Sequence, residues 1–219
     1  MATQDVEQLI ATLESPALRE LAARGRIQQY RKDVVVVQEG DHGDTLLIIL
    51  AGRVKVFATG ADDRELVFDI HGPGEYIGEM ALDGGPRSAS VMTLEPTTCS
   101  VVTRTTLKDH IAKHPEFAFE LLGKVIHRAR RATDRARDLA LLDVYGRVRR
   151  LFESLAVERE GVRIVPEKLT HQEIADRVGS SREMVSRLMK DLERGGYISV
   201  AEKLVRHAPC PVLVARHRA

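Results

Sequence analysis

The sequence predicts an α+β chain of two domains, in which a small antiparallel β-roll and a long helix are followed by a helix-turn-helix domain. Three observations support this prediction. β-branched runs alternate with glycine-rich turns between residues 28 and 103, apolar residues keep a helical spacing from about 116 to 138, and residues 169–188 follow the pattern helix, glycine-containing turn, helix. We expect the boundary at Asp143/Val144, which gives domains of residues 1–143 and 144–219.

Composition places the chain among soluble globular proteins. It has 219 residues, of which 43% are hydrophobic and 30% charged, and no apolar run approaches the ~18 residues that span a bilayer. The N-terminus lacks the basic start and apolar core of a secretion signal, so we expect a cytoplasmic location and no membrane partner. Cys99 and Cys210 are too few for a disulfide framework, a structural zinc site or a four-cysteine iron–sulfur cluster within one chain.

The net charge of +1 is divided unevenly at the expected boundary. Residues 144–219 carry 15 Lys and Arg against 10 Asp and Glu, a net charge of +5. Residues 1–143 carry 18 against 22, a net charge of −4. A basic second domain suits contact with nucleic-acid phosphates, although an asymmetry of this size serves only as agreement with the motifs.

Two short helices and a β-roll are expected in the first domain. Apolar residues at helical spacing from Asp5 to Arg24, interrupted near Pro16, predict the helices. Glycines then lie where the strands must reverse, because glycine accepts the positive φ angles of tight turns. The strands are expected at Val34–Val37, Leu46–Leu50, Val54–Phe57, Leu66–Phe68, Ser90–Met92 and Ser100–Val102.

A long helix closes the first domain. A helical region begins at Leu107–His110, and Pro115 marks the start of the long helix at about Glu116 to Asp138. Along it a seam of residues at alternating spacings of four and three suits pairing with a second copy, so we expect a homodimer. The alternative is that this stripe packs on the chain's own β-roll, but the flanking charges leave only a narrow apolar face. The seam residues are Leu122, Ile126, Ala129, Thr133 and Ala136.

The second domain is expected to begin with a helix at Val144–Ala156 and a strand at Val162–Val165. Thr170 with Glu173 has the spacing of a capping box, and Ser181 is placed to cap the next helix. The first turns of that helix would read base edges, with Arg182 on a guanine and Glu183 on a cytosine amine. An ordinary exposed Arg-Glu pair is the alternative, and the surrounding motif favours DNA contact. The residues assigned to DNA are Thr170, Gln172, Ser181, Arg182, Glu183, Ser186 and Arg187, of which Gln172 and Ser181 are expected on the phosphate backbone.

The loop of residues 78–90 combines one arginine, two carboxylates and several small residues. Arg87 offers a planar fork of donors to a phosphate, Ser88 adds a hydroxyl, and small neighbours let backbone N–H groups approach an anion. Glu79, as an acceptor, suits a ribose hydroxyl. The alternative is a surface ion pair between Glu79 and Arg87, which would contribute little to stability.

The order Gly-Glu-x-Ala-Leu…Pro-Arg-Ser-Ala-Ser in residues 78–90 resembles the phosphate-binding cassette of cyclic-nucleotide-binding domains. Together with the bihelical motif, it resembles the cyclic AMP receptor protein/FNR family of bacterial transcription regulators, from about Val6 to Val200. The resemblance implies a cyclic-nucleotide-binding, jelly-roll-like β-roll with a dimerisation helix, followed by a winged helix-turn-helix domain. It implies cAMP as the effector, with cGMP as the other candidate, and no metal. The implied contacts are Gly78, Glu79, Met80, Ala81, Arg87, Ser88 and Ala89.

The resemblance also bears on the base and on the partners. Family adenine contacts come from two adjacent hydroxyl residues, at the positions of Ala132 and Thr133. Thr133 keeps a hydroxyl, whereas Ala132 cannot hydrogen-bond through its side chain, so the departure concerns the base more than the phosphate and ribose. The implied partners are double-stranded palindromic DNA with TGTGA-like half-sites, a second copy of the chain, and RNA polymerase.

Residues 201–219 form an atypical tail that departs from the family pattern. The stretch from Ser199 to Arg216 is similar to the closing helix and strand of universal stress proteins, but it lacks that family's nucleotide-binding loop, so no such activity follows. Val212–Val214 is expected to pair with Tyr197–Val200 as the far side of an enlarged wing, confined to an edge by Pro209 and Pro211. Nothing in the sequence lowers the pKa of Cys210, so no redox role is predicted.

The leading hypothesis is therefore a homodimeric DNA-binding regulator controlled by a cyclic nucleotide, through the long helix and a hinge at Asp143. The alternative is a constitutive regulator, or one that answers a different small molecule. Haem sensing ranks lower because His71, His110 and His127 show no ligand pattern. Catalysis ranks lowest, and no catalytic residue is assigned, because no nucleophile with its base or metal-ligand cluster is visible in the sequence.

Overall fold

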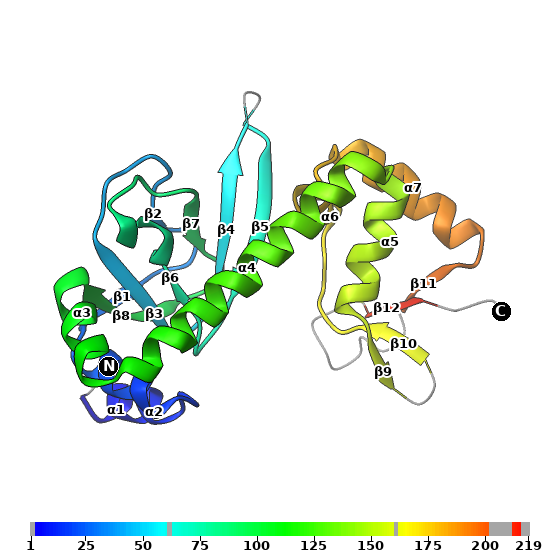
Figure 1. The fold of residues 1–219 in the computed structure, drawn as a ribbon. Helices are drawn as coiled ribbons and strands as arrows, with labels where there is room; N and C mark the ends of the chain where they lie inside the picture. The colour runs from blue at the N-terminus through cyan, green and yellow to red at the C-terminus, as the bar shows by residue number, and fades with distance from the viewer. Residues whose placement is uncertain (1–2, 61–62, 160–161, 202–211, 216–219) are drawn as a thin grey trace. The chain divides into compact units, whose positions relative to one another are not determined.

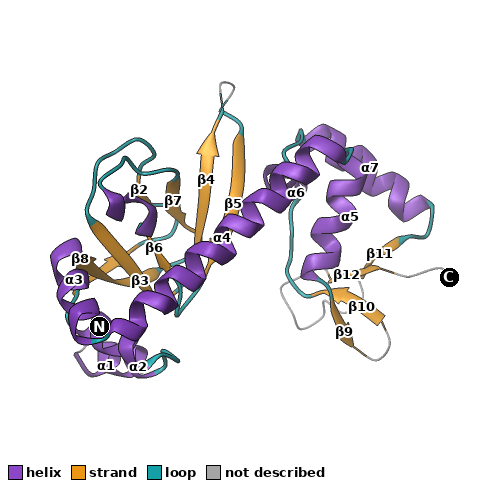
Figure 2. Cartoon of the chain, viewed as in Figure 1, coloured by secondary structure: helices purple, strands orange, loops and turns teal. Residues whose placement is uncertain are grey.

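The structure is a computed structural model that describes residues 3–60, 63–159, 162–201 and 212–215 (Figures 1 and 2). The chain packs as two compact units. The first comprises the described residues of Met1–Asp62 and Val67–Ala132, and the second those of Asp63–Leu66 and Thr133–Ala219. The functional boundary at Asp143/Val144 rests on different criteria and stays a prediction.

The chain begins with two short helices, as predicted: α1 (Thr3–Ala11) and α2 (Pro16–Ala23). Ser15 caps α2, because its hydroxyl accepts a hydrogen bond of 3.2 Å from the backbone N–H of Leu18. Pro16 suits the first helical position, where its missing N–H needs no partner. Leu18 and Leu21 are buried against the β-roll, so the helices close one side of its core.

The β-roll consists of two four-stranded sheets, and all of its described strand pairings are antiparallel. The six predicted strands are all present. Two further strands carry little sequence signal, because one has a polar pattern and the other has only two residues. The first sheet has the order β1 (Arg26–Tyr30), β8 (Thr97–Thr103), β3 (Thr45–Ala51), β6 (Tyr76–Ile77); the second has the order β2 (Val35–Val37), β7 (Ser90–Thr93), β4 (Val54–Thr59), β5 (Glu65–His71).

Strand β3 supplies both apolar clusters of the β-roll. Successive side chains of a strand point to opposite faces, and accordingly Leu46 and Ile48 enter the cluster beneath α1 and α2, whereas Leu47 and Ile49 enter the second cluster. Cys99 lies fully buried in that second cluster, and burial raises the pKa of its thiol to about 12. The thiol therefore stays protonated and packs as a small apolar group.

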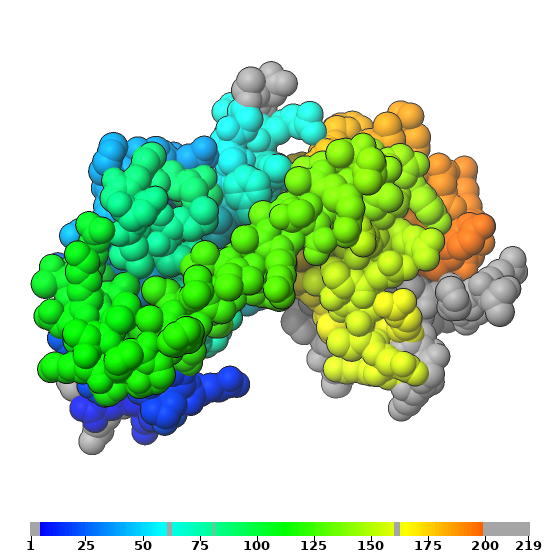
Figure 3. Space-filling model, viewed as in Figure 1, coloured from blue at the N-terminus to red at the C-terminus, as the bar shows by residue number. Residues whose placement is uncertain are grey.

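Helix α3 (Arg104–Lys113) leads into the long helix α4 (Pro115–Leu141), which extends three residues beyond the predicted end. Phe117 anchors the start of α4 in the roll core. By contrast, the seam residues Leu122 and Ile126 are 51% and 42% exposed. The space-filling view shows that α4 lies uncovered on the face toward the viewer (Figure 3). The alternative that the seam packs on the chain's own β-roll is therefore wrong for these two residues.

The second unit is built on three helices: α5 (Val144–Leu155), α6 (His171–Val178) and α7 (Arg182–Arg194). The predicted capping box of Thr170 and Glu173 is present, and Ser181 caps α7 by accepting from the Met184 N–H at 3.2 Å. Gly179 ends α6 in the left-handed conformation, with φ +65°, which glycine adopts without a Cβ clash. The core of this unit contains Val148, Phe152, Ile174, Val185 and Met189.

A four-stranded sheet completes the second unit, in the order β11 (Ile198–Ala201), β12 (Val212–Ala215), β10 (Val162–Val165), β9 (Val157–Arg159). The predicted pairing of the tail is confirmed, since Val200 lies opposite Leu213. The predicted edge position is wrong, because β12 also pairs with β10 through Ile164 and Val214. Pro209, Cys210 and Pro211 lie outside the described residues.

Within the part of the chain that the structure describes, no helix is both long enough and apolar enough to cross a membrane.

Replacing Thr170 with alanine should destabilise the second unit by about 1 kcal/mol, because the capping box is lost. The Thr170 hydroxyl accepts from the Glu173 N–H at 3.2 Å, and the Glu173 carboxylate accepts from the Thr170 N–H at 2.6 Å. Guanidinium unfolding followed by circular dichroism measures the loss. Thr170→Ser keeps the cap and should unfold like the parent, and equal midpoints for the alanine variant and the parent would contradict this account.

Candidate functional site

The connection between β6 and β7, residues 78–89, is called the cassette here. It begins with a short 3-10 helix, η1 (Glu79–Asp83), and returns to β7 through Arg87. Two backbone hydrogen bonds hold Arg87 to a neighbouring loop: its N–H donates to the Asp41 carbonyl at 2.8 Å, and its carbonyl accepts from the Gly40 N–H at 2.9 Å. The backbone beneath the arginine is therefore fixed before any ligand binds.

The guanidinium of Arg87 points into the protein and donates hydrogen bonds to neutral carbonyl and hydroxyl oxygens. The residue is 8% exposed. Its Nη1 donates to the Gly78 carbonyl, and its Nη2 donates to the carbonyl and hydroxyl of Thr45, each at 3.0 Å. Among the residues that the structure describes, no carboxylate forms an ion pair with it. Burial lowers the pKa of Arg87, whereas the charges of Asp44 and Glu79 act in the opposite direction.

Two glycines make room for this guanidinium. A Cβ at Gly78 would lie 2.4 Å from Nη1 of Arg87, and Gly78 also has φ +93°, a conformation that other residues rarely adopt. A Cβ at Gly43 would lie 2.8 Å from Nη2. The guanidinium thus occupies a slot that these two glycines leave open.

The remaining cassette residues differ in their exposure. Ser88 is exposed, and its hydroxyl donates to the sulfur of Met80 at 3.4 Å, so both side chains are at the surface. Ala89 is buried behind them. The side chain of Ala81 lies outside the described part of the structure. The assignment of Gly78, Met80, Ala81, Ser88 and Ala89 to a nucleotide stays a prediction.

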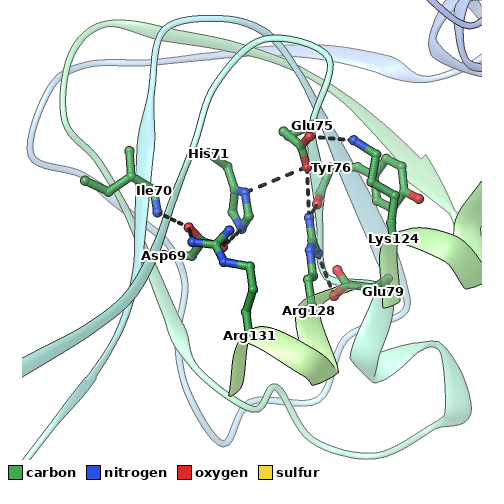
Figure 4. Close-up of polar contacts among 9 residues, drawn as sticks. All are labelled: Asp69, Ile70, His71, Glu75, Tyr76, Glu79, Lys124, Arg128 and Arg131. Carbon is green, nitrogen blue, oxygen red and sulfur yellow. Dashed lines mark hydrogen bonds and ion pairs between the residues drawn. The ribbon is translucent and has the colours of Figure 1, made fainter. Parts of the chain in front are cut away.

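Glu79 forms an ion pair with Arg128 of α4, not with Arg87. Nη1 of Arg128 lies 2.6 Å from the Glu79 carboxylate, whose side chain is only 6% exposed, and Nη2 donates to the Tyr76 carbonyl at 2.6 Å (Figure 4). The alternative of a surface pair between Glu79 and Arg87 is therefore not what the structure contains. Sequence reasoning missed Arg128 as a functional residue, although it lies one turn before Ala132, which the family resemblance had marked.

A ladder of basic side chains on α4 extends this contact. Lys124 lies 2.5 Å from Glu75, and Arg131 forms a two-pronged hydrogen bond with Asp69 at 2.7 and 2.9 Å (Figure 4). The basic residues at 124, 128 and 131 are spaced by four and three, so they share one face of the helix. This spacing was visible in the sequence, but their acidic partners come from the distant strand β5 and the residues that follow it.

Ala132 and Thr133 follow Arg128 on α4, and both are exposed. Ala132 ends the first compact unit and Thr133 begins the second. Their assignment to the base of a nucleotide stays a prediction.

The second candidate site is the exposed face of α7. Val185, Met189 and Leu192 bury one side of this helix. Three predicted base-reading residues, Arg182, Glu183 and Arg187, lie exposed on the other side, and Ser186 is half-buried. Within the described residues, no salt bridge engages either arginine, so both guanidinium groups are available to a ligand.

The predicted backbone-contacting residues also serve the local fold. The hydroxyls of Thr170 and Ser181 accept the capping bonds of α6 and α7, and each hydroxyl still has a proton to donate to a phosphate. The Gln172 amide donates to Asp176 at 2.8 Å and is exposed. Their roles in DNA contact stay predictions.

Comparison with known proteins matches the two segments of the chain that hold these candidate sites. The family described as "Cyclic nucleotide-binding domain" matches residues 27–114, and "Bacterial regulatory proteins, crp family" matches residues 168–198. The "CRP-like cAMP-activated global transcriptional regulator" of Mycobacterium tuberculosis is 33% identical over 211 residues, which cover 94% of each chain. The chain belongs to the CRP/FNR family of transcription regulators.

Two further proteins place this CRP/FNR-family regulator among its relatives. The "cAMP-activated global transcriptional regulator Vfr" of Pseudomonas aeruginosa is 29% identical over 209 residues, covering 89% of this chain and 96% of Vfr. The solved structure of CLP from Xanthomonas campestris, described as a c-di-GMP responsive global regulator, has a TM-score of 0.75 and 26% identity. The matched region covers 93% of this chain and 99% of the CLP chain. The fold class predicted from the sequence is thereby confirmed.

The stability of this regulator should rise with pH near neutrality because of His71. Burial, followed by the charge of Arg128, lowers the pKa of His71, while Asp69, Glu75 and Glu79 oppose the shift. The unfolded chain therefore binds more protons than the folded one, and the free energy of unfolding falls as the pH drops below the ordinary histidine pKa of about 6.5. The loss levels off below the lowered folded pKa.

Denaturant unfolding at several pH values between about 5 and 8 measures this dependence. His71→Gln should lose part of the slope. His127→Gln, at an exposed position on α4, should keep it. A slope in His71→Gln as steep as in the parent would assign the pH dependence to other groups.

Proposed function

We propose that this regulator is a homodimer whose DNA binding is controlled by cAMP held in the β-roll. The observation that carries the proposal is the buried guanidinium of Arg87, which has no carboxylate partner among the described residues. A buried charge without a counter-charge is costly, so such a group favours a site for an anion. A cyclic phosphate supplies that negative charge, and the nearby carboxylate of Glu79 is an acceptor for a ribose hydroxyl.

The free donors of Arg87 support the same ligand. A guanidinium has five N–H groups, and three of them meet the oxygens of Gly78 and Thr45. These bonds fix the plane of the group and leave two donors for a phosphate. Ser88 is the next residue in the chain, and its exposed hydroxyl is a further donor that a ligand can reach.

The identity of the nucleotide rests on weaker support than the phosphate site. Relatives described as cAMP-activated favour cAMP, and the Thr133 hydroxyl could hydrogen-bond an adenine. Ala132 offers no such bond, and the similar regulator CLP is described as c-di-GMP responsive. A regulator that answers cGMP, c-di-GMP or another small molecule, or none, is therefore the alternative.

Arg128 and Arg147 supply a route for control. Arg128 holds Glu79 from α4, so a ribose that engages Glu79 must change or share this ion pair. At the other end of α4, Arg147 donates to the carbonyls of Leu142 and Val178, both at 2.7 Å, and so ties the α4–α5 junction to the end of α6. We infer that the ligand shifts the population of recognition-helix positions along this helix, through the hinge at Asp143.

The exposed seam of α4 supports the homodimer. Leu122 and Ile126 are large apolar residues exposed on α4, at the spacing of a coiled coil. A twofold dimer presents two recognition helices, which suits palindromic DNA with half-sites about one helical turn apart. The family resemblance suggests TGTGA-like half-sites and a contact with RNA polymerase.

Calorimetric titration tests the effector site. The purified parent should show saturable binding of cAMP, and cGMP and c-di-GMP titrated separately identify the alternative. Arg87→Gln should lose the binding heat, because the anion loses its charged partner. Arg53→Gln, at a half-exposed arginine paired with Glu95 at 3.4 Å, is the matched control and should bind like the parent. Unchanged affinity in Arg87→Gln would remove the cassette from the effector site.

Fluorescence anisotropy with palindromic DNA tests the recognition helix. Arg182→Ala should weaken specific binding by about 1–3 kcal/mol and leave binding to random duplex nearly unchanged, because the fork reads a base. Arg194→Ala removes an exposed arginine from the last turn of the same helix and should retain specificity. Equal losses on specific and random DNA would instead make Arg182 a phosphate contact.

A further inference from the structure

Three potential metal ligands lie close together in the first unit, and none of them belongs to the cassette. They are Glu20 of α2, His110 of α3, and His114, which ends α3 immediately before α4. One ligand atom from each residue lies within 4.8 Å of the other two. Glu20 and His110 are 90 positions apart in the sequence, so no spacing motif announces the cluster. The family resemblance likewise implies no metal.

His110 is unusual because it is fully buried and its ring has no normal hydrogen bond. The residue is 0% exposed, and neither Nδ1 nor Nε2 has a hydrogen-bond partner among the described residues. Its ring lies 4.7 Å from that of His114 and 5.2 Å from that of Phe117, measured between centroids. Burial, followed by the charge of His114, lowers the pKa of His110, and a weak contact with the Ala17 backbone offsets only part of this shift. A buried polar side chain without a partner requires an explanation.

The surroundings of His114 resemble the outer shell of a metal site. Its Nε2 lies 3.0 Å from Glu20, while its Nδ1 lies 3.4 Å from the carboxylate of Glu116. Histidines that bind metals with one nitrogen usually give the other nitrogen's proton to a carboxylate or carbonyl. Glu116 is placed to accept that proton. The half-exposed Glu20 gives an ion access from solvent.

We propose that Glu20, His110 and His114 bind a Zn²⁺ ion. Two imidazole nitrogens and one carboxylate oxygen match a known class of zinc donor sets, in which the ligands lie about 2.0–2.2 Å from the metal and water completes a tetrahedron. The three ligand atoms already lie within 4.8 Å of one another, so they face one common position. The ion would give the unpartnered ring of His110 its missing contact, and it would fasten α2 to the turn that precedes α4.

An ordinary ion pair is the competing explanation. Pairing of the His114 ring with the carboxylates of Glu20 and Glu116 accounts for the two distances without a metal. It leaves the buried ring of His110 with only a weak contact to the Ala17 backbone, however, and gives no reason for an imidazole at a buried position where an apolar residue would pack. The metal explanation predicts tight zinc binding that requires Glu20 and His114, whereas the ion-pair explanation predicts no tight zinc binding at this cluster.

Zinc titration of the full-length chain, made without a histidine tag and stripped of metal, tests the proposal. Competition with a chromogenic chelator should show one tight Zn²⁺ equivalent per chain. Glu20→Gln and His114→Gln should each remove it, because each variant loses one of the three proposed ligands, and both side chains reach the surface. Glu116→Gln should weaken it by about 10- to 100-fold, as expected for an outer-shell partner.

Matched controls locate the ion. His127→Gln removes an exposed histidine of α4, and a double variant, His207→Ala with Cys210→Ser, removes alternative ligands from the tail. Both should keep the tight equivalent, and Zn²⁺ should raise the melting temperature of these controls but not of Glu20→Gln. The proposal is overturned if the parent binds no zinc in competition with the chelator, if the two ligand variants keep parental affinity, or if the tail variant loses it.

Discussion

The ion pair between Glu79 and Arg128 is the contact on which the organisation of the first unit depends. It joins the cassette, the segment suited to a ligand, to α4, the helix that continues into the second unit. Because the Glu79 side chain is nearly buried, loss of its partner would leave a poorly solvated charge. The pair therefore holds cassette and helix in one arrangement, and any ligand that engages Glu79 acts on the helix through the same atoms.

Arg87 and Arg128 differ in whether a carboxylate neutralises their charge. Arg128 is neutralised by Glu79 and Glu75, whereas Arg87 rests on the uncharged oxygens of Gly78 and Thr45. Carbonyl oxygens orient a guanidinium but do not cancel its charge, so the site retains a net attraction for an anion. A structural arginine is satisfied by a carboxylate, and an arginine that serves a ligand is held in place while its charge remains uncompensated.

The sequence predicted features whose causes are local. The capping box at Thr170, the long helix and the six clearly β-branched strands follow from neighbouring residues, and the structure contains each of them. It also marked Arg87 and Glu79 as functional candidates, but not the partner of either. Arg128 reaches Glu79 across 49 positions, and His110 meets Glu20 across 90. Such contacts depend on how the sheets and helices pack, which residue spacing does not encode. The edge assignment of β12 failed similarly, since strand order is a property of the whole sheet.

The composition of α4 fits a helix that binds the β-roll with one face and leaves another face for a different surface. One face must bind the β-roll, and it does so mainly through Lys124, Arg128 and Arg131, whose long side chains reach acidic groups of the roll. Apolar packing to the roll is concentrated near the start of the helix, at Phe117. This leaves Leu122 and Ile126 for another surface. A helix fastened by apolar residues along its whole length could not change position without exposing them, whereas an ion pair can be released when a ligand group takes the place of one partner. Attachment by charges is therefore the form of contact that suits a helix required to respond to a ligand.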